Sequence, residues 1–193
     1  MGRCKFAELY KQVQGPNFVA GYESIYLYGT SGSGKSHILA ALVCQLIREG
    51  KRIVYVPDCA AMLQDSTSVF REALCCAFYD SKQHLKSIES ARNHEELFTF
   101  WSRHRDVFLI VDQLNALEIG GCTANMDDVK NHVMRYLMRM KFRHKYIFSA
   151  SANEQSNQAT LGKQSGITVI KIYGGMTQVC RHCPAALYNS HII

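Results

Sequence analysis

The sequence lacks any apolar run long enough to span a membrane, and its first ten residues contain none of the length of a signal peptide. It also shows no internal repeat and no clear linker. These absences exclude a helical membrane protein, and the chain as written is expected to be intracellular or a fragment. The 193 residues, of which 47% are hydrophobic and 20% charged, suit one soluble globular domain rather than a disordered chain.

A disulfide framework is also absent. The cysteines number eight, but five of them are scattered over expected helices, strand ends and loops, namely Cys44, Cys59, Cys75, Cys76 and Cys122. We therefore expect reduced thiols. Cys180 and Cys183 form a single C-x-x-C motif with no second pair of ligands nearby, and a zinc site completed by His182 or His191 is the alternative there.

Residues 29–36 match the pattern G-x-x-x-x-G-K-[ST] at every position. Before them, residues 24–28 are apolar and predict a buried strand, and after them residues 37–47 are apolar with good helix formers. Strand, glycine-rich loop and helix form the context in which backbone N–H groups and a helix N-terminus hold a polyphosphate. A glycine turn without a ligand is the alternative.

The same pattern assigns a role to each part of a nucleotide site. We expect Lys35 to reach the β- and γ-phosphates of ATP or GTP, and the Ser36 hydroxyl to bind Mg²⁺. The residues predicted to contact the nucleotide are Gly29, Thr30, Ser31, Gly32, Ser33, Gly34, Lys35, Ser36 and His37.

A second feature is a continuous apolar run that starts after Asp106 and ends at Asp112, as expected of a parallel strand buried on both faces. Ligands of open α/β sheets gather at the carboxyl ends of the strands, so Asp112 should lie beside the glycine-rich loop. We interpret the run as a Walker B element in which Asp112 holds, through water, the Mg²⁺ bound by Ser36. An Asp that merely ends a strand is the alternative.

Three further apolar stretches predict strands, at residues 51–57, 145–150 and 167–173. Helices are expected between them, at residues 58–79 in one or two pieces, 94–101 and 126–140, with an exposed helix or connector at 80–93. This alternation predicts an α/β fold, a doubly wound, mostly parallel five-stranded sheet flanked by helices. The expected parts are an N-terminal extension, a nucleotide-binding domain and a tail of unclear structure, at residues 1–21, 22–176 and 177–193.

The net charge of +6 is unevenly placed. Cations crowd one short stretch, which contains Arg135, Arg139, Lys141, Arg143 and Lys145. They indicate either a surface that faces nucleic acid or the solvated end of a helix, because Lys and Arg are favoured at helix C-termini.

With these motifs in hand, residues 22–173 resemble the additional-strand branch of P-loop ATPases, which includes the AAA+ and signal-transduction ATPases. Residues 29–57 are also similar to bacterial helicase-loader and transposition ATPases. More narrowly, the chain resembles the NTPase domain of Crinkler-type effectors of oomycetes and fungi at residues 26–36, 109–117, 148–153 and 172–176. This resemblance implies ATP or GTP binding, a sensor-like role for Ser151 or Asn153, a host protein as partner, and secretion with delivery to the host cytoplasm or nucleus.

Two departures from the pattern of these ATPases bear on the reaction. The residue after the Walker B Asp is usually Glu, whereas here it is Gln113, whose amide orients water but is a poor proton acceptor, so that slow hydrolysis is expected. Asn115 and Glu118 are nearby substitutes without the expected spacing. Residues 151–166 contain no arginine, which disfavours a ring motor with an arginine finger in trans.

The leading interpretation is an ATPase with Mg²⁺ as cofactor, held by Ser36 and Asp112, and with Lys35, Asp112, Gln113 and Asn153 as catalytic residues. One alternative is a nucleotide-dependent switch that scarcely hydrolyses and senses the γ-phosphate through residues 149–153. Another is a small-molecule kinase, although a kinase needs an Arg-bearing lid and only Arg181 follows Arg143.

Overall fold

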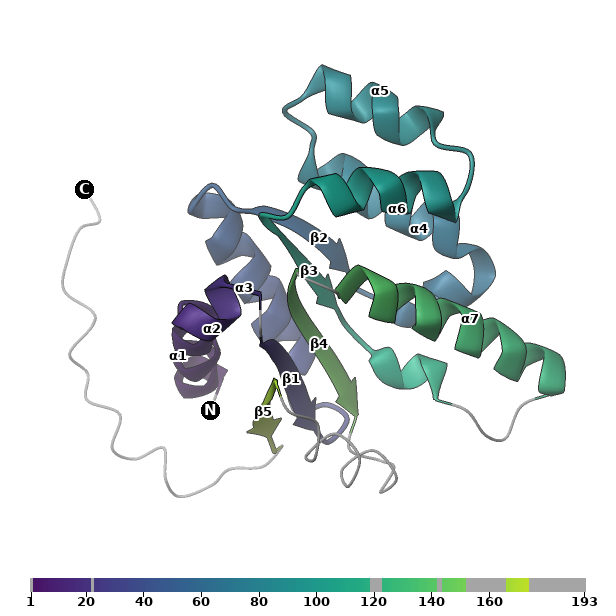
Figure 1. Cartoon of the computed structure of the whole chain (residues 1–193). Coiled ribbons are helices and arrows are strands. Elements are labelled where there is room, and N and C mark those ends of the chain that lie inside the picture. Colours follow the sequence, from purple (N-terminus) through teal and green to yellow (C-terminus); the bar gives the residue numbers. More distant parts are fainter. Residues whose placement is uncertain (1, 22, 119–122, 142–143, 152–165, 174–193) are drawn as a thin grey trace.

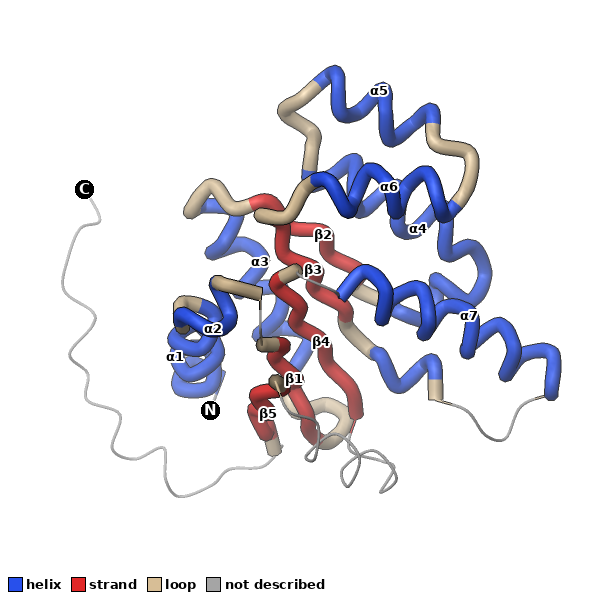
Figure 2. The backbone as a smooth tube through the Cα atoms, viewed as in Figure 1, coloured by secondary structure: helices blue, strands red, loops and turns tan. Residues whose placement is uncertain are grey.

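The protein is seen here as a computed structural model, which describes residues 2–21, 23–118, 123–141, 144–151 and 166–173. Within these ranges the chain forms one five-stranded sheet in the order β2-β3-β4-β1-β5 (Figures 1 and 2). Every pairing in it is parallel, which confirms the predicted α/β class. The strands are β1 Ser24–Gly29, β2 Arg52–Val56, β3 Val107–Val111, β4 Lys145–Ser151 and β5 Ile167–Ile172.

The position of β4 decides the type of sheet. It lies between β1, which leads into the glycine-rich loop, and β3, which leads to Asp112. An inserted strand at this place is the feature that the additional-strand type predicts. Both β1 and β3 are buried along their whole length, because helices cover the two faces of the sheet. Apolar and polar residues therefore do not alternate along these two strands.

Helices on one face are α1 Gly2–Val13, α2 Pro16–Val19 and α3 Lys35–Arg48 (Figure 1). They enclose a cluster of buried side chains in which Leu9, Val13 and Phe18 pack with residues of α3 and the sheet. The segment before the first strand therefore supplies part of the core that supports the glycine-rich loop.

The other face carries α4 Met62–Ala77, α5 Lys82–Ser90, α6 His94–Arg103 and α7 Ala124–Lys141 (Figure 1). The predicted helix at residues 58–79 consists of two pieces, a 3-10 turn η1 Cys59–Ala61 and α4, whose backbone departs from helical geometry at Asp65. The polar stretch at 80–93 contains α5, which is capped by Ser81 and buries Ile88. No helix among the described residues combines the length and the apolar character that a membrane crossing needs.

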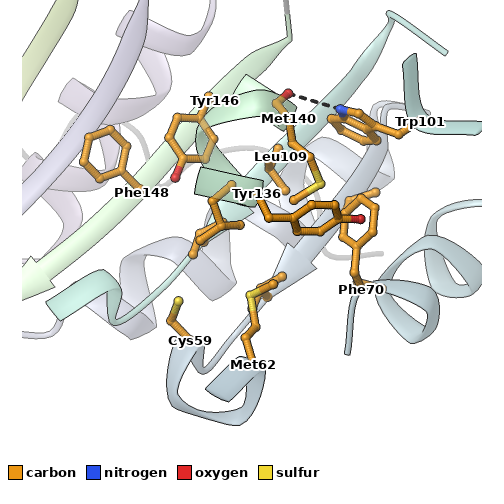
Figure 3. Close-up of a cluster of buried hydrophobic side chains, with 14 of the residues drawn as sticks. Cys59, Met62, Phe70, Trp101, Leu109, Tyr136, Met140, Tyr146 and Phe148 are labelled. Atoms are coloured by element: carbon orange, nitrogen blue, oxygen red, sulfur yellow. Dashed lines mark hydrogen bonds between the residues drawn. The ribbon is translucent and has the colours of Figure 1, made fainter. Parts of the chain in front are cut away.

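The core under these helices includes Trp101 (Figure 3). Its ring is fully buried, stacks on His144 with centroids 4.1 Å apart, and donates a hydrogen bond from Nε1 to the Met140 carbonyl oxygen at 3.1 Å. Phe70 meets Tyr136 edge to face. These contacts join α4, α6, α7 and the start of β4, and so hold the strands whose opposite ends form the candidate site.

Candidate functional site

Most of the residues predicted to form a nucleotide site meet at the carboxyl edge of the sheet. There they line a pocket of about 630 Å³. Parallel strands end at a common edge, and the register brings Gly29 of β1 level with Ser151 of β4. The lining residues are Ser31, Gly32, Gly34, Lys35, Ser36, His37, Asp112, Gln113, Asn115, Glu118, Ser149 and Ser151.

The glycines of the loop are needed for two different reasons. Gly32 and Gly34 have φ of 73° and 89°, a conformation that L side chains rarely adopt, and a Cβ on either would meet open space. Gly29 is different, because a Cβ there would lie 1.7 Å from the carbonyl oxygen of Ile172 in β5. The first glycine is therefore required by strand packing, and the other two by the turn into α3.

Lys35 opens α3 and is 8% exposed. Its Nζ donates hydrogen bonds to the carbonyl oxygens of Gly29 and Thr30, each at 2.8 Å, and lies 3.5 Å from Ser33 Oγ. Burial lowers the pKa of Lys35, while the charge of Asp112 acts in the opposite direction. The loop thus holds its own cation at the pocket through groups that a phosphate oxygen can replace.

Asp112 is 1% exposed, and both its carboxylate and its backbone form hydrogen bonds. Oδ1 accepts a hydrogen bond from the Gln113 N–H at 2.9 Å and another from the Ser149 hydroxyl. The backbone of Asp112 donates to Val56 O at 2.9 Å and accepts from Cys59 N–H at 3.2 Å. Sequence reasoning missed the partnership with Ser149, because it depends on β4 lying next to β3.

The chain turns sharply after Asp112. Gln113 has φ 59° and ψ 41°, and among the described residues it is the one non-glycine with positive φ. It precedes the 3-10 turn η2 Leu114–Leu117, from which Asn115 Oδ1 accepts a hydrogen bond from Ser151 N–H at 3.2 Å. Lys130 of α7 donates from Nζ to the Glu118 carbonyl oxygen at 2.8 Å, which fixes the far end of the turn.

The donor set fits a nucleoside triphosphate with Mg²⁺. Lys35 and the N-terminus of α3 supply positive charge, and the Ser36 hydroxyl and the Asp112 carboxylate offer the hard oxygen ligands that Mg²⁺ prefers. Three of the predicted contact residues, Gly29, Thr30 and Ser33, are not part of the lining but form hydrogen bonds with Lys35 Nζ. Asn153, Arg143, Cys180 and Cys183 lie outside the described residues, as does the predicted tail.

Of the clustered cations that the structure describes, Lys145 does not share a surface with the others, so the nucleic-acid prediction is wrong for this residue. Lys145 opens β4 at the amino edge of the sheet, is 9% exposed, forms an ion pair with Asp106 and lies over the Phe108 ring. Arg139 forms two hydrogen bonds to the Glu95 carboxylate, at 2.6 and 3.0 Å. Arg135 is exposed on α7. Cations that are close in the sequence are therefore buried in one case and exposed in another.

With this geometry established, comparison with known proteins bears on the first part of the chain. Residues 7–72 match the family model described as IstB-like ATP binding protein. The match spans the glycine-rich loop and covers less than half of the chain. No curated protein matches.

Solved structures similar to the chain include AMPPCP-bound DnaA from Aquifex aeolicus, at 18% sequence identity and a TM-score of 0.42. A DNA replication initiation factor is similar at 20% identity and a TM-score of 0.43. In both cases 86% of this chain and 44% of the other chain are covered. The chain therefore spans less than half the length of these two structures.

Proposed function

We propose that the protein binds Mg·ATP and hydrolyses it to ADP and phosphate, with GTP as the alternative substrate. The observation that carries the proposal is a single pocket in which Lys35, Ser36 and Asp112 meet the glycine-rich loop at the carboxyl edge of the sheet. The match of residues 7–72 to a family described as ATP binding supports ATP as the nucleotide.

In this proposal the loop amides and the N-terminus of α3 hold the phosphates, and Lys35 exchanges the carbonyl oxygens of Gly29 and Thr30 for β- and γ-phosphate oxygens. Ser36 and Asp112 are the residues that would hold Mg²⁺, directly and through water. When bound, Mg²⁺ offsets the negative charge that develops on the phosphate oxygens. Gln113 orients the attacking water through its amide, and Asn153 is kept as the predicted sensor of the γ-phosphate.

A nucleotide-dependent switch is the second candidate function. It is favoured by residue 113, which is an amide where related ATPases usually have a carboxylate. Such a switch would bind ATP, hydrolyse it slowly, and change the arrangement of the turn after Asp112 and of the β4 end when the γ-phosphate is present.

The test is phosphate release from ATP and from GTP, together with equilibrium binding of a fluorescent ATP analogue. Lys35→Ala and Asp112→Ala should abolish release, whereas the matched control Lys86→Ala, on the exposed side of α5, should leave it unchanged. Wild-type release at the level of Lys35→Ala would overturn hydrolysis. Tight binding with that result would support the switch, and phosphate transfer to added nucleosides would support a kinase.

The finer assignments rest on sequence alone. We keep as predictions the resemblance to Crinkler-type effectors, with host delivery and a host protein partner, and the division of the chain at residues 22 and 176. Nucleic-acid binding is retained for Arg135 and Lys141 of α7. This prediction requires that the affinity for DNA falls as the salt concentration rises, and that Arg135→Ala lowers it further. An affinity that changes with neither would contradict the nucleic-acid prediction.

A further inference from the structure

Hydrolysis at this site needs a group that takes a proton from the attacking water. An amide is a poor proton acceptor, so Gln113 does not fill that role. Among the described residues that line the pocket, the carboxylates are Asp112 and Glu118. Asp112 is almost fully buried and already accepts hydrogen bonds from Ser149 and Gln113, whereas Glu118 is partly exposed and therefore reachable by water.

The 3-10 turn explains how Glu118 comes to face the same pocket as Asp112. Side chains three residues apart on a 3-10 helix lie on the same side. Asn115 lies in η2 and Glu118 directly follows it, and both side chains line the pocket. The usual glutamate follows the strand directly. Here the chain turns at Gln113, which has positive φ, and the carboxylate that lines the pocket is that of Glu118, after the 3-10 turn.

Backbone contacts hold this position from both sides. The Glu118 N–H donates to Asn115 O at 3.1 Å, and the Glu118 carbonyl oxygen accepts from Lys130 Nζ at 2.8 Å. Asn115 is in turn held by Ser151 N–H at the end of β4. Glu118 is thus supported by both α7 and the sheet, as a group that must meet a substrate in a fixed geometry needs to be.

Charged and titratable groups of the described residues face the same pocket from several elements. Lys35 and His37 come from α3, Asp112 follows β3, and Lys130 lies on α7. Burial raises the pKa of Tyr26 on β1, and the charges of Tyr28 and Glu118 add to this rise.

We propose that Glu118 is the general base of this site, an inference that rests on the proposed hydrolysis of ATP. The oxygen of a water molecule forms a bond to the γ-phosphorus, the bond from the γ-phosphorus to the β,γ-bridging oxygen breaks, and its electron pair stays on ADP. The water proton moves to a carboxylate oxygen of Glu118 and passes to solvent after phosphate leaves.

The experiment compares Glu118→Gln with Glu118→Asp, Gln113→Ala and the charge-matched control Glu89→Gln, which lies exposed on α5. Phosphate release, affinity for a fluorescent ATP analogue, the melting temperature and the nucleotide extracted from the purified complex are measured for each. Glu118→Gln should lower release by about 100-fold or more. Its ATP affinity should stay within twofold, and ATP rather than ADP should be recovered from the protein.

In the wild type, release should also decline toward acid as Glu118 is protonated, and this decline should be missing from the residual rate of Glu118→Gln. Glu118→Asp keeps a carboxylate and should retain part of the rate, which separates loss of the base from loss of the fold.

Release by Glu118→Gln within threefold of the wild type, with Gln113→Ala inactive, would overturn the inference and leave the proposed function standing. Wild-type release at the level of Lys35→Ala would instead show that hydrolysis itself fails. A lowered melting temperature in both Glu118 variants, with equal loss of ATP affinity, would assign Glu118 a structural role and also overturn the inference.

Discussion

Replacement of Gly29 by Ala tests whether the first glycine of the loop serves packing rather than phosphate binding. The new Cβ would lie 1.7 Å from Ile172 O and 2.7 Å from Ile172 C, both backbone atoms of β5. Real Cβ contacts essentially never fall below 3.0 Å, so β1 and β5 must move apart at their paired ends, where Gly29 is in register with Ile172.

The magnitude follows from that separation. Overpacking against a neighbour that cannot rotate away costs about 1–3 kcal/mol. Loss of two ladder hydrogen bonds between β1 and β5 adds about 1 kcal/mol each. The free energy of unfolding should therefore fall by about 3–5 kcal/mol, a large part of the ~5–15 kcal/mol of an ordinary domain.

Urea unfolding of the nucleotide-free protein, followed by far-ultraviolet circular dichroism, measures this cost without any contribution from ligand binding. Gly32→Ala and Gly34→Ala are the matched controls, because a Cβ there meets open space and only the positive φ is unfavourable, at about 1–2 kcal/mol. A Gly29→Ala protein as stable as these controls, or more stable, would refute the packing argument.

Three further outcomes are expected. Ser149→Ala removes the hydroxyl that donates a hydrogen bond to Asp112 and accepts one from the Gln113 N–H. The free energy of unfolding, measured with urea, should fall by about 1–2 kcal/mol, and Mg²⁺-dependent ATP binding, measured by fluorescence titration, should weaken. Unchanged binding would contradict a role of Ser149 in positioning Asp112. Burial, with a smaller effect of Arg105, lowers the pKa of His144 from 6.5 to about 4, so the neutral ring's stabilisation is complete above pH 6.5 and is lost as the pH falls toward 4. The loss should be about 2 kcal/mol and absent in His144→Phe, and equal acid sensitivity of both proteins would count against it. Trp101→Phe should lower stability by about 1–3 kcal/mol through the lost Met140 hydrogen bond and a small cavity, and a melting temperature equal to that of the wild type would contradict this.

Local patterns predicted the elements that form the candidate site. The apolar run before Asp112 became β3, and the apolar stretches around the glycine-rich loop became β1 and α3. Burial on both faces leaves a continuous apolar signature in such strands, which is why they are readable from neighbours in sequence. The polar stretch at 80–93 was less decisive, because α5 has a single buried residue, Ile88, and so lacks the apolar stripe that identifies a helix.

Contacts across the sheet were not predictable in the same way. Lys145 belongs to a cluster of cations in sequence, yet its place at the start of β4 buries it beside Asp106. The hydrogen bond from Ser149 to Asp112 also requires β4 to lie next to β3. The additional-strand resemblance predicted the place of β4, but these side-chain contacts depend on packing between segments that are distant in sequence.

The sequence by itself determined that a glycine-rich loop joins a buried strand to a helix and that an aspartate ends another buried strand, because periodicity and glycine chemistry are local properties. Only the tertiary structure decided which contacts the loop, the strands and the aspartate make with one another. It showed that Gly29 packs closely against Ile172 of β5, that Ser149 donates a hydrogen bond to Asp112, and that Glu118 lines the same pocket as Asp112. These depend on strand order and register, which arise only when the whole sheet is assembled.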